Sequence, residues 1–378
     1  MNILIFSWRD SKHPLAGGAE QVMHEHAKGW IANGHRVTLF ASKIDSLPFR
    51  EELDGVEIVR GGYHYLGVQV AAFFHYIKNR KSYDFIVDQF HGIPFFTPIY
   101  TKKPKVAVIQ ETARKVWFLN PLPKPLNWIV GLIGFLGEPF VFLFYKNTHF
   151  ITGSDSAKKA ISKFGIPLKN ITVVPHGVVI SGKWGVESRS WKKEKVKTIV
   201  YLGVLAKDKG IEDAIKCFEI LNKKGKFQFW VIGKAETKEY GEKIQRLVSK
   251  INLKERIKFY GFVSQDKKFE LLSKAHILAN PSAHEGWGLV NIEANSVGVP
   301  VVAYNSAGLV DSVKNGISGI ICNENTPENL AKNILSLFND EKLYEKLKQG
   351  SKKWSKNFSW NKSKNKSYLL IKKISNEI

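Results

Sequence analysis

The sequence is poor in cysteine and lacks the spacings that bind metals. Cys217 and Cys322 are its only cysteines, and neither belongs to a CxxC pair or a Cys/His cluster. Neither a disulfide framework nor a zinc site is implied, and this usage fits a reducing compartment. Residues 1–7 contain no basic leader and no small-residue cleavage site. We therefore interpret them as a core strand and expect a cytoplasmic protein.

No apolar run predicts a membrane-spanning helix. The longest run, 126–145, approaches the length of a span but contains Glu138 and Pro139, a charge and a helix breaker. Two interpretations of this helical region remain open. Either it docks the chain on a lipid surface, or it packs as core or covers a cleft in a soluble protein. The aromatic residues expected near that surface are Trp117, Phe118, Trp128 and Phe135.

Negative charge is scarce, and the formal net charge is +23. Such a field favours anionic partners, namely nucleotide phosphates, an anionic membrane surface or nucleic acid. A nucleic-acid binder would carry aromatic residues among its lysines, whereas many aromatic residues here lie in the lysine-poor stretch 117–144. We therefore expect no nucleic-acid partner.

Apolar runs of strand length alternate with helical stretches in both halves of the chain. This alternation is typical of parallel sheets covered on both faces, so we predict an α/β fold with two doubly wound, Rossmann-like domains. Ligands of such sheets bind beyond the carboxyl ends of the strands. Strands are predicted at 2–6, 35–41, 56–59, 84–87, 105–109, 150–152 and 171–174, and then at 198–202, 228–232, 257–260, 276–279, 299–303 and 319–321.

The periodicity is lost over residues 181–197, which are rich in Gly, Ser and charge and are predicted to form a linker. The domains are then expected at 1–180 and 198–358. A C-terminal helix at 359–378 is proposed to pack back on the first domain. His176 and Gly177 are interpreted as a hinge.

Two carboxylates flank a glycine-rich turn in the second half. Glu285, Gly286 and Gly288 follow a predicted strand, and a helix begins near Leu289 with Glu293 one turn inside it. A helix start behind small residues exposes backbone N–H groups and the positive end of a dipole, which suits a diphosphate. The carboxylates can accept hydrogen bonds from the hydroxyls of a sugar and of a ribose. The alternative is that both glutamates are surface residues near a helix start.

This segment resembles the hallmark of glycosyltransferase family 4, whose members are retaining enzymes. Their GT-B fold has two Rossmann-like domains that face each other across a cleft. The hallmark is Glu-x7-Glu within P-S-x-x-E-G-F-G-L-x-x-x-E-A-x-x-x-G-x-P-V-V. The matching residues are Pro281, Ser282, Glu285, Gly286, Trp287, Gly288, Leu289, Glu293, Ala294, Gly298, Pro300, Val301 and Val302.

The resemblance implies roles for these residues in binding a nucleotide-sugar donor. Glu285 would contact the sugar and act in catalysis, and Glu293 would bind the ribose. Backbone amides of the turn would hold the diphosphate, and the residues concerned are Gly286, Trp287, Gly288 and Leu289. By this resemblance the second domain binds the donor and the first domain faces the acceptor.

A second loop, 201–210, is predicted to supply a cation. Lys209 precedes a helix start and can neutralise a departing diphosphate. The family pattern is G-R-L-x-x-x-K-G, and the chain has Val204 in place of the arginine, with Lys207 as a possible substitute. The resemblance also implies that Gly203 lies at the donor. It further implies that Val263, after a later strand, contacts the base through its backbone.

In the first domain the resemblance implies that Gly17 and Gly18 approach the donor phosphates. His91, after the strand at 84–87, is a catalytic candidate close to the sugar and the acceptor, and a purely structural histidine is the alternative. Glu111 and Arg114 are expected on the acceptor side. Glu20 is interpreted only as a residue of the first helical turn, and Asp155 as a helix cap.

The predicted function is metal-independent transfer of a sugar with retention of configuration. The donor is a UDP-, GDP- or other nucleotide-sugar, and the acceptor is a glycan or a lipid-linked molecule, reached in part at the inner face of the cell membrane. The sequence has no Asp-x-Asp motif, so no metal or other cofactor is expected. The alternatives are a GT-B nucleotide-sugar epimerase, a glycan phosphorylase and, more remotely, a nucleic-acid binder. A Rossmann oxidoreductase is disfavoured because no GxGxxG follows the first strand.

Overall fold

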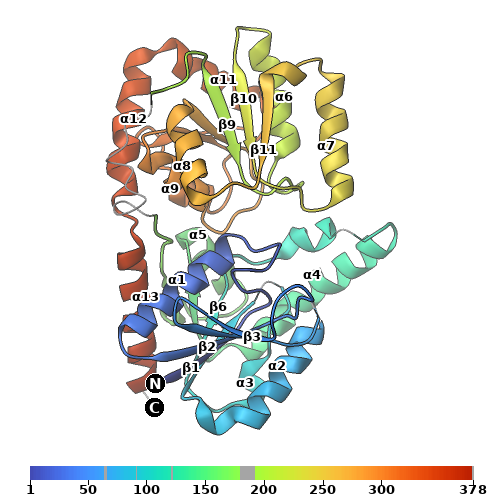
Figure 1. Cartoon of the computed structure of the whole chain (residues 1–378), viewed down its shortest axis with the longest axis vertical. Helices are drawn as coiled ribbons and strands as arrows, with labels where there is room; N and C mark the ends of the chain where they lie inside the picture. Colours follow the sequence, from blue (N-terminus) through green and yellow to red (C-terminus); the bar gives the residue numbers. More distant parts are fainter. Residues whose placement is uncertain (64–65, 91, 121, 179–191, 377–378) are drawn as a thin grey trace. The chain divides into compact units, whose positions relative to one another are not determined.

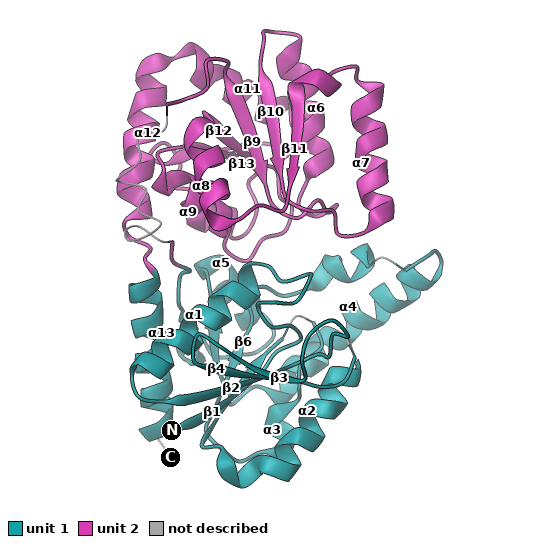
Figure 2. Cartoon of the chain, viewed as in Figure 1, with its two compact units in different colours: residues 1–176, 360–378 teal, residues 177–359 magenta. Residues whose placement is uncertain are grey.

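The computed structural model describes residues 1–63, 66–90, 92–120, 122–178 and 192–376, which form two compact units (Figure 2). Unit 1 comprises Met1–His176 and Trp360–Ile378, and unit 2 comprises Gly177–Ser359. The boundary falls between the two residues interpreted as a hinge. Most of the predicted linker at 181–197 lies outside the described residues.

Unit 1 is built on a sheet in the order β3-β4-β2-β1-β5-β6-β7-β8. Its neighbouring strands are parallel except for β3 and β4. Sequence reasoning did not predict β3, because its residues, REEL, show no apolar alternation. Asp54 and Gly55, with positive φ, form the tight turn after it. The strands are β1 (Asn2–Phe6), β2 (Arg36–Ala41), β3 (Arg50–Leu53), β4 (Val56–Arg60), β5 (Phe85–Gln89), β6 (Lys105–Val108), β7 (His149–Thr152) and β8 (Ile171–Val173).

Helices cover both faces of this sheet. On one face α1 (Gly18–Ala32) and α13 (Trp360–Asn376) pack against alternate residues such as Ile3 and Val106. On the other face α2 (Leu66–Asn79) packs against Leu4, and the end of α4 (Leu126–Phe144) packs against Ala107. The remaining helices are α3 (Thr97–Tyr100), α5 (Asp155–Ser162) and the short 3₁₀ helices η1 (Arg80–Ser82), η2 (Arg114–Leu119) and η3 (Leu168–Asn170).

The C-terminal helix α13 completes unit 1 rather than unit 2, which precedes it in the chain. His26 Nε2 of α1 lies 3.0 Å from Ser363 Oγ, and Trp30 Nε1 donates to Ser367 Oγ at 3.1 Å. Figure 1 shows α13 beside α1. Buried hydrogen bonds between residues 337 positions apart therefore join the two ends of the chain.

We expect the free energy of unfolding to fall as the pH drops below 6.5, because buried histidines stay neutral in the folded state. Burial lowers the pKa of His26 from 6.5 to about 4 and that of His176 to about 3. Each neutral ring contributes stability that is fully present above pH 6.5. As the pH falls from 6.5 to the folded-state pKa, the free energy of unfolding decreases by up to ~1.4 kcal/mol per pH unit for each ring. Denaturant titration across this range measures the slope, and His26→Gln should make it shallower. If the slope for His26→Gln equalled that of the unchanged protein, it would contradict the prediction that His26 stays neutral in the folded state.

The 3₁₀ helix η2 packs on α4 at two glycines. A Cβ at Gly131 would lie 2.6 Å from Phe118 Cδ1, and one at Gly134 would lie 2.3 Å from Trp117 Cδ2. Phe135 also contacts Phe118, with ring centroids 5.9 Å apart. These three aromatic residues are half-buried and join η2 to α4. Part of each of these rings is therefore used in packing η2 onto α4, whereas Trp128, also expected near a lipid surface, is 58% exposed.

Unit 2 contains a parallel sheet in the order β11-β10-β9-β12-β13-β14. The strand order reverses between β9 and β12, and such a switch point is where ligands of open α/β sheets bind. The strands are β9 (Thr198–Leu202), β10 (Gln228–Ile232), β11 (Ile257–Gly261), β12 (Ile277–Asn280), β13 (Val301–Ala303) and β14 (Gly319–Ile321). The helices are α6 (Ile211–Asn222), α7 (Lys238–Lys250), α8 (Gln265–Lys274), α9 (Leu289–Ser296), α10 (Leu309–Ser312), α11 (Pro327–Asn339) and α12 (Glu341–Ser355), with the 3₁₀ helix η4 (Lys254–Arg256). The predicted class, two doubly wound α/β domains, is confirmed.

Candidate active site

Two predicted catalytic residues meet at the switch point of unit 2. Lys209 Nζ donates to the carbonyl oxygen of His284 at 2.9 Å and lies 3.2 Å from Glu285 Oε2. The two side chains come from the loops after β9 and β12, 76 positions apart in sequence. Both are about one quarter exposed. A cation and a carboxylate are therefore paired where a ligand can reach them.

Close backbone packing joins these two loops. Ala283 N donates to the carbonyl oxygen of Asp208 at 2.8 Å. Gly210 has a φ of 71°, and a Cβ there would lie 2.1 Å from the carbonyl oxygen of Pro281. Only glycine fits this position. Gly210 thus allows Lys209 to approach Glu285.

Glycines at the ends of three neighbouring strands keep side chains away from this edge of the sheet. Gly203 N donates to Ile232 O at 3.0 Å, and Gly233 N donates to Gly261 O at 2.8 Å. A Cβ at Gly233 would lie 1.8 Å from Gly203 O. The structure therefore places Gly203 where a donor could approach the backbone. Gly233 was missed, although a glycine directly after a predicted strand signals it.

The glycine-rich turn leads into α9 as expected. Gly288 is the N-cap, with a φ of 83°, and α9 begins at Leu289. The first N–H groups of a helix lack partners within the helix. The Trp287 ring is buried, with its centroid 5.0 Å from that of Phe358. The buried ring leaves only the backbone of Trp287 for the donor contact that was expected of it.

A second missed glycine supports this turn from behind. Gly308 has a φ of 77°, and a Cβ there would lie 2.2 Å from the carbonyl oxygen of Glu285 and 2.8 Å from Gly286 C. Its sequence signal is weak, since it lies five residues after a short strand. Gly308 fixes the position of the Glu285 backbone.

Glu293 is more enclosed than the sequence indicates. Its carboxylate is nearly buried, and Lys268 Nζ of α8 lies 2.5 Å from Glu293 Oε1. The side chain of Lys268 is itself only 13% exposed. Sequence reasoning missed Lys268 because nothing distinguishes it from the surface lysines around it. Lys268 and Glu293 thus form a nearly buried ion pair one turn into α9.

The position of the missing arginine is open to solvent. Val204 is 46% exposed, and its carbonyl oxygen accepts a hydrogen bond from Tyr201 Oη at 2.8 Å. Tyr201, which was missed, is buried beneath the loop, and burial raises its pKa. Lys234 follows the adjacent strand, and its carbonyl oxygen accepts from Leu205 N at 2.8 Å. Lys234 and the exposed Lys207 are thus two further cations near this edge.

The predicted base contact lies on the loop after β11. Val263 is half-buried and packs against the core of unit 2. Its neighbour Phe262 is 74% exposed, and Lys234 Nζ lies 5.3 Å from the centroid of the Phe262 ring. An aromatic surface therefore accompanies the backbone groups that were expected to meet the base.

In unit 1 the predicted glycine pair opens α1. Gly17 is the N-cap, and its N–H donates to Glu20 Oε2 at 2.7 Å. A Cβ at Gly18 would meet no atom within 4 Å. Glu20 does more than occupy the first turn, since it is buried and also binds Arg9 Nε at 3.0 Å. The glycine loop is therefore held by an ion pair.

The predicted catalytic His91 lies outside the described residues. The strand before it, β5, extends to Gln89, two residues beyond the expected end. Asp88 at its end is buried and accepts hydrogen bonds from Tyr145 Oη at 2.5 Å and Thr97 Oγ1 at 2.8 Å. Burial raises the pKa of Asp88.

The predicted acceptor residues lie after β6. Gln110 directly precedes them and is buried, and its Oε1 lies 2.8 Å from His176 Nε2. The Arg114 guanidinium lies 4.5 Å from the Phe135 ring centroid, and Glu138 accepts from Arg114 N at 2.8 Å. Glu111 is half-buried. Arg114 also borders a cavity of about 530 Å³ lined by Thr112, Pro139, Phe140, Leu143, Ala160, Lys163 and Phe164.

The two halves of the chain match two known protein families. Residues 16–181 match Glycosyltransferase Family 4, and residues 186–354 match Glycosyl transferases group 1. The chain is a glycosyltransferase. The first match falls mainly in unit 1, and the second lies in unit 2 and includes Lys209 and Glu285.

Several similar proteins are glycosyltransferases or have solved structures with a similar fold. An uncharacterized glycosyltransferase, MJ1607 of Methanocaldococcus jannaschii, is 25% identical and covers 90% of both chains. The capsular polysaccharide glycosyltransferase CapM of Staphylococcus aureus is 34% identical over 39% of this chain and 38% of its own. Sucrose-phosphate synthase of Thermosynechococcus elongatus, at 17% identity, superposes over 100% of both chains with a TM-score of 0.78. HepE of Anabaena, solved with UDP-glucose, gives a TM-score of 0.72 at 17% identity, also over 100% of both chains.

These matches confirm the GT-B fold and the predicted class of glycosyltransferase. They give no support to an epimerase, a glycan phosphorylase or a nucleic-acid-binding protein. The roles of individual residues in this glycosyltransferase stay predictions.

Proposed function

We propose that the protein transfers a sugar from a nucleotide-diphosphate sugar to a hydroxyl group of a glycan or lipid-linked acceptor, with retention of anomeric configuration. The observation that carries this proposal is the solvent-accessible pair of Lys209 and Glu285 at the switch point of unit 2, directly before α9. The UDP-glucose complex of the similarly folded HepE supports a nucleotide-sugar as donor.

The pair separates two chemical tasks. The diphosphate binds at the first N–H groups of α9, where the helix dipole favours an anion, and Lys209 Nζ turns towards it. Glu285 then accepts hydrogen bonds from the sugar hydroxyls. Negative charge grows on the leaving phosphate as the glycosidic bond breaks, and preorganised donors stabilise that charge in the transition state. The helix dipole and Lys209 thus supply positive charge without a bound metal.

Retention follows if the acceptor attacks the face of the sugar from which the diphosphate departs. The bond between C1 and the phosphate oxygen breaks, the bond between C1 and the acceptor oxygen forms, and the hydroxyl proton passes to the departing phosphate. This part of the proposal rests on the resemblance to family 4. NMR of the anomeric proton in the product tests it, because an inverted centre would exclude it.

Glu285→Gln is expected to lower kcat by about 10- to 150-fold, because the sugar loses a charged hydrogen bond worth ~1.5–3 kcal/mol. The affinity for the free nucleoside diphosphate should change less than about threefold, since Glu285 faces the sugar. The measurement first identifies the donor by ligand-detected NMR on a panel of nucleotide-sugars and then follows product formation. Glu324→Gln, at an exposed site of unit 2, is the control. Full turnover by Glu285→Gln would place the sugar elsewhere.

A further inference from the structure

The helix α4 of unit 1 is apolar but is not a core helix. Among the described residues it alone is long and apolar enough to cross a membrane, yet only 17% of its most apolar 18-residue window is buried. Ile133 is 66% exposed and Phe140 is 65% exposed. The interpretation of this run as core is therefore wrong. The exposed apolar side chains of α4 are Leu126, Trp128, Ile129, Leu132, Ile133, Leu136, Phe140, Leu143 and Phe144.

The exposed apolar surface continues onto α3 and α2, which lie on the same face of the sheet. The Phe144 ring lies 6.0 Å from that of Phe96, directly before α3, and Tyr100 of α3 lies 5.1 Å from Phe73 of α2. On these two helices the exposed apolar side chains are Leu66, Val70, Phe73, Phe74, Ile77 and Ile99. We call the exposed apolar residues of α2, α3 and α4 the α2–α4 face.

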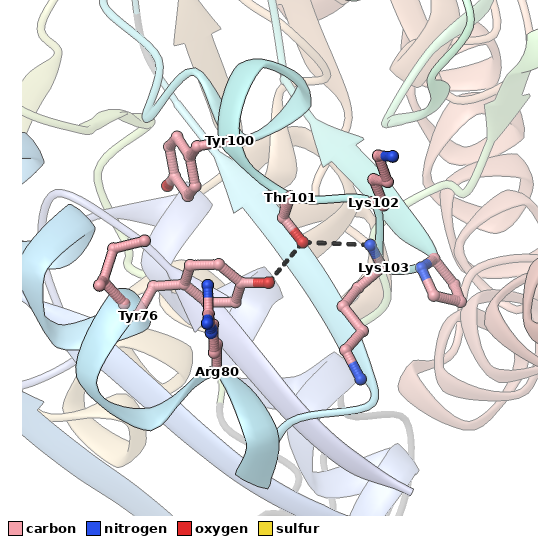
Figure 3. A pocket seen from close by; sticks show the side chains of 8 residues that line it. Tyr76, Arg80, Tyr100, Thr101, Lys102 and Lys103 are labelled. Carbon is pink, nitrogen blue, oxygen red and sulfur yellow. Dashed lines mark hydrogen bonds between the residues drawn. The ribbon is translucent and has the colours of Figure 1, made fainter.

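Basic residues border this face. A cavity of about 430 Å³ is lined by Arg80, Lys102 and Lys103 together with Tyr76 and Tyr100 (Figure 3). Tyr76 belongs to α2 and Tyr100 to α3, two of the three helices that form this face. The cavity lies at the edge of the sheet where β6 begins, opposite to the edge at which β5 ends.

The surrounding sequence leaves this positive charge uncompensated. Residues 66–105 contain six Lys or Arg and two acidic residues. Of these two, Asp88 is buried, and Asp84 accepts a hydrogen bond from Asn2 N at 2.8 Å.

We propose that the α2–α4 face docks on an anionic lipid bilayer. Its apolar side chains enter the boundary between headgroups and acyl chains, and Arg80, Lys102 and Lys103 bind lipid phosphates. The charge favours this occupant over a second copy of the chain, because two molecules that each carry +23 repel one another. This proposal does not depend on the identity of the donor or the acceptor.

The contacts of α4 favour docking over spanning. Glu138 is buried and accepts hydrogen bonds from Ala113 N at 2.7 Å and Arg114 N at 2.8 Å. Phe142 is also buried and stacks on Phe164, with centroids 4.4 Å apart. A spanning α4 would have to break these contacts. The helix therefore lies on the bilayer while its last turns stay in unit 1.

Flotation of the full chain with lipid vesicles tests the proposal. We expect the protein to float with vesicles of phosphatidylcholine and phosphatidylglycerol at about 50 mM salt, to float much less at about 500 mM, and not to float with phosphatidylcholine alone. The double substitution Ile133→Ser and Phe140→Ser should reduce the bound fraction at least fivefold. Lys102→Gln with Lys103→Gln should also reduce it and weaken the salt dependence.

Matched controls lie on α13, which covers the opposite face of the same sheet. Leu369 is 54% exposed, so Leu369→Ser is the control for the apolar substitutions. Lys366→Gln with Lys372→Gln removes two exposed charges and is the control for the lysine substitutions. These variants should bind as the unchanged protein does, and thermal unfolding confirms that all variants are folded. The proposal is overturned by absence of flotation at low salt, by equal losses in test and control variants, or by a lipid-independent dimer that Ile133→Ser with Phe140→Ser dissociates.

Discussion

Lys209→Ala is expected to lower kcat by about 10²- to 10³-fold, the usual effect of removing one donor that stabilises transition-state charge. Its ammonium group contacts His284 O and Glu285 Oε2 at the edge where the diphosphate is proposed to leave. This chain has Val204 where the family pattern has an arginine that would share this task. We therefore expect Lys209 to supply most of the positive side-chain charge that faces the diphosphate. Donor turnover at saturating substrate measures the effect.

Two matched variants separate this role from general loss of charge. Lys207→Ala removes an exposed lysine two residues away and should leave kcat within about twofold. Val204→Arg should give equal or higher activity, since Val204 is 46% exposed and has room for a longer side chain. In the Lys209→Ala background it should restore part of the lost rate. Near wild-type turnover by Lys209→Ala would show that another residue, with Lys234 the first candidate, forms the clamp.

Glu293→Ala is expected to weaken binding of the nucleoside diphosphate by about 10- to 150-fold, because the ribose hydroxyls lose a charged acceptor worth ~1.5–3 kcal/mol. Isothermal calorimetry on the folded protein measures the change. The variant should also be less stable, since Lys268 would lose a nearly buried partner 2.5 Å away.

Lys268→Ala distinguishes binding from stability. It breaks the same ion pair but keeps the Glu293 carboxylate that is proposed to meet the ribose. We expect it to lower the melting temperature as Glu293→Ala does, with a smaller loss of affinity. If both variants bound the nucleoside diphosphate as tightly as the unchanged protein does, Glu293 would not bind the ribose.

The residues proposed to bind the donor in unit 2 could be selected from the sequence because their patterns are local. The segment from Glu285 to Glu293 contains a turn, a helix start and two carboxylates, and their spacing alone determines that they share one end of α9. Lys209 could be added because parallel strands bring their carboxyl ends to one edge of a sheet. Neither prediction required knowledge of long-range packing.

The residues that were missed act through contacts between distant segments. Lys268 reaches Glu293 from α8, and Gly308 supports Glu285 from the loop before α10. Tyr201 lies beneath Val204 and is buried. A lysine, a glycine or a tyrosine at these positions has no local pattern, because its role arises from which loops the strand order places side by side.

The sequence by itself determined the alternation of strands and helices and the GT-B class, and it supplied the residues that are proposed to bind the donor, since these depend on short-range periodicity and on motifs of a few residues. Only the tertiary structure decided that α13 closes unit 1 through Ser363 and Ser367 and that α4 is exposed rather than core. Both outcomes depend on which surfaces remain uncovered after packing. A helix of given hydrophobicity can bury its apolar side chains against protein or against lipid, and its composition does not distinguish the two.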